Sequence, residues 1–258
     1  IEGKSPNKHN RFYIIAEPME KKVYNAMVAG DIKSDLEIKK KDVELQEKLA
    51  QLGFDRDDAK KIKLIYNRNM FMDRTEGVHA ILEVMEMLKQ SFKEAMNEGP
   101  LAREPCSGVK IKLVDAKLHE DAIHRGPAQM IPAMRNAIYG AMTLAEPILL
   151  EPIQKVFVSV PHELMGNVTR EITQRRGTII DIKQEGDMSI IQAKAPVAEM
   201  FGFANAIRSA TQGRAIWNLE FMGFEKVPES LQMDVIKSIR ERKGLKAQLP
   251  KPSDFISQ

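Results

Sequence analysis

The sequence is poor in cysteine and lacks a long apolar run. Its one cysteine in 258 residues, Cys106, cannot form a disulfide within the chain, which is typical of a reducing compartment such as the cytoplasm. The longest apolar segment, 137–153, is interrupted by acidic residues and prolines, whereas a membrane helix needs roughly 18 uninterrupted apolar residues. No signal peptide opens the chain. We therefore expect a cytoplasmic protein that does not insert into a membrane.

A phosphate-binding loop and a marked net charge are also missing. No Gly-x-x-x-x-Gly-Lys-Ser/Thr sequence occurs, so we expect this chain to bind and hydrolyse no nucleotide through such a loop and to need no cofactor. The 39 basic and 36 acidic residues leave a formal net charge of +3, so any RNA binding must depend on local clusters of charge. Because the first residue is Ile1, we expect a piece of a longer protein or a processed product.

Two segments of the first half alternate apolar and other residues, as half-buried strands do. They are residues 11–18 and 109–113, and in the second Lys110 and Lys112 separate the apolar positions. After Leu113 the apolar residues change phase, which predicts a bulge or a sharp twist. Helices are predicted from about Lys21, after the capping acid Asp55, over 77–97 and over 130–145, the last with Pro132 in its first turn.

The second half predicts two similar βαβ units. After a proline-rich junction at 146–152, strands are expected at 156–160, 178–183, 189–195 and 215–221, and helices at about 162–176 and 199–211. This order is that of a ferredoxin-like βαββαβ domain. One more helix begins at Pro228, and a tail with two prolines ends the chain.

Two polar loops, 119–129 and 4–11, carry the candidate chemistry. His119 and His124 are five residues apart, whereas a helical zinc motif places its histidines four apart, so we expect no metal site. Asp121 and His124 suit a general acid–base pair, but no nucleophile or oxyanion device accompanies them. Solvated histidines on a surface loop are the plain alternative. The second loop, 4–11, holds three cations and no acid, which suits contact with RNA phosphates. If the strand ends lie side by side, the two loops form one cationic tip.

Three stretches resemble one protein family in the family's order. They are Ser5-Pro-Asn-Lys-His-Asn-Arg11, the segment 115–132 with its Ile-His-Arg-Gly motif, and 151–221. Together they resemble translation elongation factor 2, the ribosomal translocase of archaea and eukaryotes. Gly126-Pro127-Ala128 departs from the triple glycine of eukaryotic members and is more similar to the archaeal branch.

The resemblance implies an α+β fold of two domains. Domain IV, 1–149, is expected to resemble the second domain of a small-subunit ribosomal protein. Domain V, 150–221, is the ferredoxin-like βαββαβ domain, and a C-terminal helix and tail, 222–258, are expected to pack back on domain IV. The GTP-binding domain, which holds GTP and magnesium, and domains II and III are not in this chain.

The resemblance also implies site residues and partners. His124 is the expected diphthamide site, at a tip that presents His124 and Arg125 to solvent. Contacts with RNA or the ribosome are expected from Lys4, Lys8, His9, Asn10, His119, Arg125, Arg175 and Arg176. Arg208 and Arg214 are further candidates for phosphate contacts. The partners are ribosomal RNA, tRNA, mRNA and the enzymes that make diphthamide, and the protein is expected to be a monomer.

Two other functions stay open on the residues alone. A stand-alone RNA-binding α+β module would show salt-dependent binding to many RNAs. A small enzyme using Asp121 and His124 would place them in a deep pocket rather than at an exposed tip.

Overall fold

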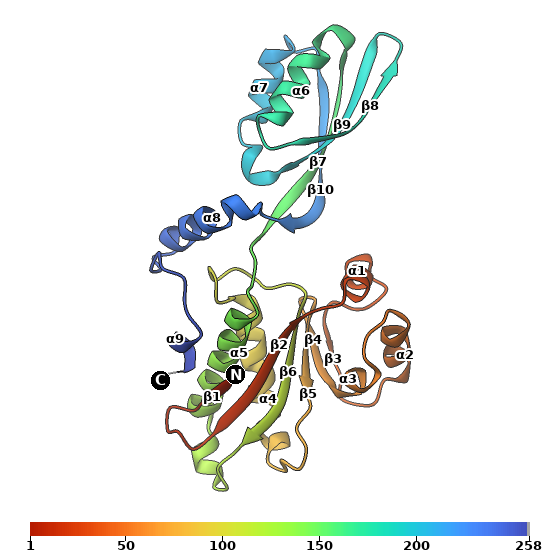
Figure 1. Cartoon of the computed structure of the whole chain (residues 1–258). Coiled ribbons are helices and arrows are strands. Elements are labelled where there is room, and N and C mark those ends of the chain that lie inside the picture. Colours follow the sequence, from red (N-terminus) through yellow and green to blue (C-terminus); the bar gives the residue numbers. More distant parts are fainter. Residues whose placement is uncertain (257–258) are drawn as a thin grey trace. The chain divides into compact units, whose positions relative to one another are not determined.

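The computed structural model describes residues 1–256 and divides into two compact units (Figure 1). Unit 1 consists of Ile1–Pro147 together with Asp234–Gln258, and unit 2 is Ile148–Met233. Ser257 and Gln258 of the expected tail lie outside the described residues. The first division falls in the proline-rich junction expected from the sequence, and the domain limits expected above stay predictions. No helix among residues 1–256 is long and apolar enough to cross a membrane.

Unit 1 contains a mixed six-stranded sheet of order β1-β2-β6-β5-β4-β3, in which only β5 and β6 are parallel neighbours. The strands are β1 (Glu2–Lys4), β2 (Arg11–Pro18), β3 (Leu36–Glu37), β4 (Ile62–Tyr66), β5 (Asn69–Asp73) and β6 (Val109–Lys117). The strand predicted at 11–18 is confirmed. The sequence did not predict β1, β3, β4 or β5.

Helices cover both faces of this sheet. They are α1 (Lys21–Ala29), α2 (Val43–Gln51), α3 (Arg56–Lys61), α4 (Ile81–Asn97), α5 (Pro127–Leu144) and α9 (Ser253–Ile256). In β5, Phe71 packs into the core formed with α4 and α5, whereas Met70 and Met72 pack into the core formed with α1, α2 and α3. A strand buried on both faces shows no alternation of apolar and polar residues, which is why β5 escaped prediction.

The predicted bulge in β6 is confirmed. The register between β2 and β6 shifts so that Tyr13 pairs with Asp115 and Ile14 with Leu113, which leaves Val114 as the extra residue. The expectation of a half-buried strand is wrong, because Lys110 and Lys112 are buried as well. Their ammonium groups form ion pairs with Glu20 and Asp58 on the face of the sheet that α1, α2 and α3 cover.

Two helix starts differ from the prediction. α5 begins at Pro127, three residues before the expected Met130, because Pro127 occupies the first helical position, where its missing N–H costs nothing. Pro132 therefore lies inside the helix rather than in its first turn. α4 begins at Ile81 instead of residue 77. Asp55 caps α3 as predicted, accepting the backbone N–H groups of Asp57 and Asp58.

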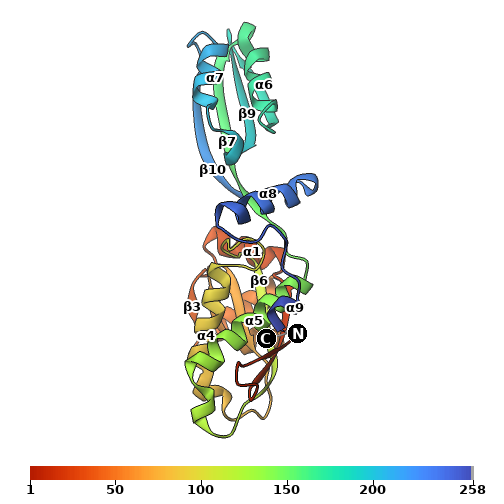
Figure 2. The ribbon, with the colours of Figure 1, turned by 90° about the vertical axis from the view of Figure 1, so that its left-hand side faces the viewer.

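Unit 2 has the ferredoxin-like topology expected from the sequence. Its strands are β7 (Leu150–Pro161), β8 (Thr178–Glu185), β9 (Met188–Pro196) and β10 (Ile216–Lys226), in the antiparallel order β10-β7-β9-β8. Helices α6 (Met165–Thr173) and α7 (Phe203–Ala210) lie side by side on one face of that sheet (Figures 1 and 2). β10 continues five residues beyond Phe221, the strand end expected from the sequence. Helix α8 (Glu229–Arg242) follows β10.

Strand β1 approaches α5 so closely that only glycine fits at position 3. A Cβ atom on Gly3 would lie 2.5 Å from Ala137 Cβ and 2.8 Å from the carbonyl oxygen of Ala133. We expect Gly3→Ala to lower the free energy of unfolding by about 2 kcal/mol, because β1 must move away from the helix. Urea denaturation measures this loss. Gly166→Ala is the matched control: its Cβ meets nothing within 4 Å inside α6, so stability should stay equal or rise. Equal stability of Gly3→Ala and the parent chain would contradict the close approach.

Candidate functional site

The two polar loops predicted to form one tip do lie side by side. β2 begins where β6 ends, with Arg11 paired to Lys117, so the loops beyond these residues meet. We call the two loops, residues 5–10 and 118–126, the histidine tip. In it the ring centroids of His9 and His119 are 5.0 Å apart, those of His9 and His124 are 5.1 Å apart, and those of His119 and His124 are 4.4 Å apart. Three imidazoles thus form one cluster.

Side-chain amides fix the main chain of His124. Its carbonyl oxygen accepts hydrogen bonds from Asn10 Nδ2 at 2.9 Å and from Asn7 Nδ2 at 3.2 Å. Asn10 Oδ1 in turn accepts the backbone N–H of His119 at 3.0 Å, and Gln129 Oε1 accepts that of Asn7 at 2.9 Å. One buried asparagine therefore connects both loops, and the main chain that carries the imidazole of His124 is held before any partner arrives.

The segment that carries His124 is a short 3₁₀ helix, Ala122–Arg125. Asp121 caps it by accepting the backbone N–H of Ile123 at 3.0 Å. His119 Nδ1 accepts the backbone N–H of Asp121 at 3.1 Å, which places the proton of the neutral His119 ring on Nε2. These hydrogen bonds stabilise one conformation of the loop that carries His119 and His124.

Two of the predicted contact residues are not presented to solvent. Arg125 is buried, and the expectation that it stands at an exposed tip is wrong. Its guanidinium donates to the carbonyl oxygen of His119 at 2.8 Å and forms an ion pair with Glu83 Oε2 at 2.5 Å, which ties the tip to α4. Asn10 is fully buried. Their contacts in this structure hold the tip together, and their expected RNA contacts stay predictions.

The exposed side chains of the tip come from both loops. Lys8 and His9, and Lys4 next to the tip at the end of β1, are exposed, whereas His119 and His124 are half-buried within the histidine cluster. Ile123, beside His124, is 78% exposed, although it is apolar. The carboxylates of Glu120 and Asp121 are exposed as well, so the tip offers groups of both charges, imidazole rings and one aliphatic side chain to a partner.

Sequence reasoning missed the residues that support the tip. Asn7 and Gln129 lie within the predicted loops but were not assigned a role, although turn asparagines often bond to nearby backbone. Glu83 had no signal at all, because it lies 42 positions from its partner Arg125.

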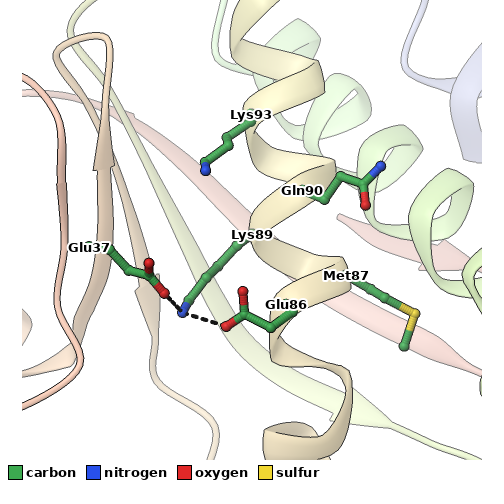
Figure 3. A pocket seen from close by; sticks show the side chains of 6 residues that line it. All are labelled: Glu37, Glu86, Met87, Lys89, Gln90 and Lys93. Atoms are coloured by element: carbon green, nitrogen blue, oxygen red, sulfur yellow. Dashed lines mark hydrogen bonds and ion pairs between the residues drawn. The ribbon is translucent and has the colours of Figure 1, made fainter.

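The geometry does not favour the enzyme reading of Asp121 and His124. Among residues 1–256 no group of three or more histidine, cysteine or acidic side chains could hold a metal ion. The Asp121 carboxylate is engaged by a backbone N–H group. Two hollows were found elsewhere in unit 1, one lined by Glu37, Glu86 and Lys89 (Figure 3) and one at the end of α8, and neither is lined by these two residues.

Of the four arginines expected to contact phosphate in unit 2, Arg208 is exposed and Arg214 forms an ion pair with Glu163 at 2.6 Å. The other two also have acidic partners. Arg175 forms an ion pair with Glu171 at 2.7 Å and lies over the ring of Phe203. Arg176 makes two hydrogen bonds to Glu151, at 2.9 and 2.8 Å, and one to Glu199 at 2.9 Å. The hydrogen bonds with Glu151 outweigh burial and raise the pKa of Arg176 above its usual value. Phosphate contacts by these arginines stay predictions.

The thiol of Cys106 carries no reactive chemistry. Burial raises its pKa to about 12, so the nucleophilic thiolate is rare at neutral pH. This agrees with a structural role next to α4, where Cys106 Sγ donates to the carbonyl oxygen of Ala95.

Comparison with protein families matches both units. Residues 32–146 match the family model described as elongation factor G, domain IV. Residues 148–245 match the model described as elongation factor G C-terminus. The two matches follow one another along the chain. The boundary between them lies just before β7, where unit 1 is followed by unit 2.

Curated relatives match almost the whole chain. The chain is 57% identical over 256 residues to an elongation factor 2 of Methanopyrus kandleri, which covers 99% of this chain and 20% of that protein. It is 54% identical to that of Methanococcoides burtonii and 53% identical to that of Archaeoglobus fulgidus, each covered to 35% of its length. The chain thus spans a fifth to about a third of these relatives. It belongs to the family of elongation factor 2 and elongation factor G, of which it represents domain IV and the C-terminal domain, in an archaeal form.

Proposed function

We propose that this chain is the C-terminal part of a GTP-dependent elongation factor that moves tRNA and mRNA by one codon on the ribosome. The histidine tip enters the decoding site and contacts the codon–anticodon duplex and its RNA surroundings. GTP and magnesium are bound by a GTPase domain outside this chain, and unit 2 packs against RNA of the large subunit. The protein works as a monomer in the cytoplasm.

One observation carries the proposal most directly: the family's histidine lies in a cluster whose backbone is fixed in advance. The groups at the tip suit RNA, because imidazoles and exposed lysines can contact both its bases and its phosphates. Rigid support of the tip lowers the ordering cost of binding.

We further propose that His124 is converted to diphthamide by its dedicated enzymes. Neutral imidazole carries no charge, whereas the modification adds a long arm with a trimethylammonium group and an amide. The arm supplies fixed positive charge where RNA must be touched. Intact-mass measurement of the protein from its native source, followed by fragmentation, should find the added mass on His124 and on no other histidine. Protein made in bacteria is the unmodified control. An unmodified His124 in native protein would overturn this assignment.

His124→Ala should leave the fold intact while impairing the tip. The side chain is half-buried and only its backbone is held by Asn7 and Asn10, so we expect a loss of about 1 kcal/mol or less in the free energy of unfolding. In the full-length factor, translocation should become slower and reading-frame slippage more frequent. Both are measured in a reconstituted translation system. Glu185→Ala, an exposed change in β8 of unit 2 at a position with no expected RNA contact, is the control. A large loss of stability in His124→Ala would show that the histidine is structural.

A further inference from the structure

One of the two hollows of unit 1 lies at the end of α8, far along the sequence from the histidine tip. The end of α8 and the segment after it line an open hollow of about 630 Å³ in unit 1. Its cationic walls are Arg240, Lys246 and Lys251, and its apolar walls include Leu245, Leu249 and Pro250. Ligand pockets commonly measure about 300–1,000 Å³ and combine apolar walls with a few polar groups.

The buried cation of Arg240 has no acidic partner among residues 1–256. It is 8% exposed, and its Nε and Nη1 donate to the carbonyl oxygens of Lys246 and Leu101 at 2.6 and 2.5 Å. Its Nη2 makes no hydrogen bond within residues 1–256 and is not among the fully buried unpaired atoms, so it is open to solvent. Burial, followed by repulsion from Arg103, lowers the pKa of the guanidinium, which nevertheless stays charged at neutral pH. Within residues 1–256 no carboxylate neutralises this cation, so its charge is available to an anion that enters the hollow.

The two lysines of the hollow are also unpaired. Within the described residues, neither Lys246 nor Lys251 forms an ion pair through its ammonium group. The acidic side chain of the wall, Asp254, accepts the backbone N–H of Lys251 at 2.8 Å. Of the described residues that line the hollow, three are thus cationic and one is a carboxylate.

The hollow lined by Lys89 shows the contrasting case. There the ammonium of Lys89 lies between Glu37 Oε1 at 2.6 Å and Glu86 Oε1 at 2.8 Å, so its charge is already neutralised (Figure 3). No anion is needed to complete that arrangement. The excess of unpaired cations is thus a property of the hollow at α8.

We propose that the hollow at the end of α8 binds a nucleotide, with its phosphate at Arg240, Lys246 and Lys251 and its base against Leu245, Leu249 and Pro250. Arginine and lysine are the usual phosphate ligands, and the volume exceeds what one inorganic phosphate fills. The nucleotide comes either from an RNA strand or from the free pool. This proposal is independent of the role of the histidine tip.

Nuclear magnetic resonance of the chain tests the proposal. We expect adenosine 5′-monophosphate to shift the backbone amide signals of residues 240–254 in a saturable way, whereas adenosine without phosphate shifts them little. A single-stranded hexa-adenylate that displaces the monophosphate identifies RNA as the source. Binding of the monophosphate alone identifies a free nucleotide. The absence of shifts with both probes overturns the proposal, and equal affinity for inorganic phosphate and the monophosphate overturns the role of the apolar wall.

Charge variants provide the matched control. Lys246→Gln with Lys251→Gln should weaken binding of the monophosphate about tenfold, because two phosphate contacts are removed. Lys237→Gln with Arg242→Gln removes the same charge from exposed positions of α8 that do not line the hollow. That control should bind as the parent chain does. Equal weakening in both double variants would show a general effect of charge and overturn the site. Amide spectra outside residues 240–254 report whether each variant stays folded.

Discussion

Replacing Asn10 by leucine is expected to lower the free energy of unfolding by about 3 kcal/mol, because each buried polar group left without a partner costs roughly 1–3 kcal/mol. Asn10 is fully buried, accepts the N–H of His119 and donates to the carbonyl oxygen of His124. Leucine has similar size but leaves the His119 N–H without its acceptor. Urea denaturation measures the loss. Ring signals of His9, His119 and His124 should shift or broaden together in nuclear magnetic resonance spectra, since the cluster loses its support.

Two comparisons separate this effect from that of losing any asparagine. Asn10→Asp keeps the acceptor for His119 but loses the donor to His124 and buries a charge, so it should also destabilise the chain. Asn205→Leu, at an exposed position of α7, should change stability by about 0.5 kcal/mol or less. If Asn10→Leu and Asn205→Leu had the same stability, the tip would not depend on the asparagine that joins its loops.

Sequence reasoning succeeded where the relevant signal was local. The change of apolar phase after Leu113 predicted the bulge that leaves Val114 unpaired. Alternating valines followed by an amphipathic helix predicted the ferredoxin-like topology of unit 2. The meeting of the two loops followed from the strands whose ends they share. Each of these features depends on residues close together in the sequence.

The missed features depend on partners that are distant in the sequence. Nothing near Arg125 indicates that Glu83 will bury it, and nothing near Arg240 indicates that it will reach the carbonyl oxygen of Leu101. The alternation around Lys110 and Lys112 suggested a face toward solvent, because lysine is seldom buried. The sheet is covered on that side by α1, α2 and α3, and the lysines pair with Glu20, which precedes α1, and with Asp58 of α3. A polar position in an alternating strand therefore indicates that its side chain lies on the other face of the sheet, but that face is not necessarily exposed to solvent.

This buried ion network should be among the most sensitive parts of the chain. Lys112 Nζ lies 2.8 Å from both Glu17 Oε2 and Asp58 Oδ2, and the Asp58 side chain is 4% exposed. Lys112→Met should lower the free energy of unfolding by about 3 kcal/mol, because the buried carboxylate of Asp58 loses its nearer cation and keeps only the half-exposed Arg74 at 3.0 Å. Lys117→Met, at the exposed end of the same strand, is the matched control and should be near neutral. Combining Lys112→Met with Asp58→Asn should cost less than the sum of the single changes, as measured by urea denaturation.

The pH dependence gives the same network a second test. Burial, the largest single effect on Glu17, favours its neutral form, but hydrogen bonds and charges from Lys112 and Lys110 outweigh it, so the pKa of Glu17 falls below its usual 4.5. The ionised Glu17 therefore contributes stability above about pH 4.5, and this contribution is lost as the pH falls through the lower folded-state pKa. Lys112→Met removes the main cation, so stability should fall less steeply with acid than in the parent chain. The free energy of unfolding of both proteins is measured between about pH 5 and about pH 3. If it fell equally with acid in both, Lys112 would not be the group that keeps Glu17 ionised.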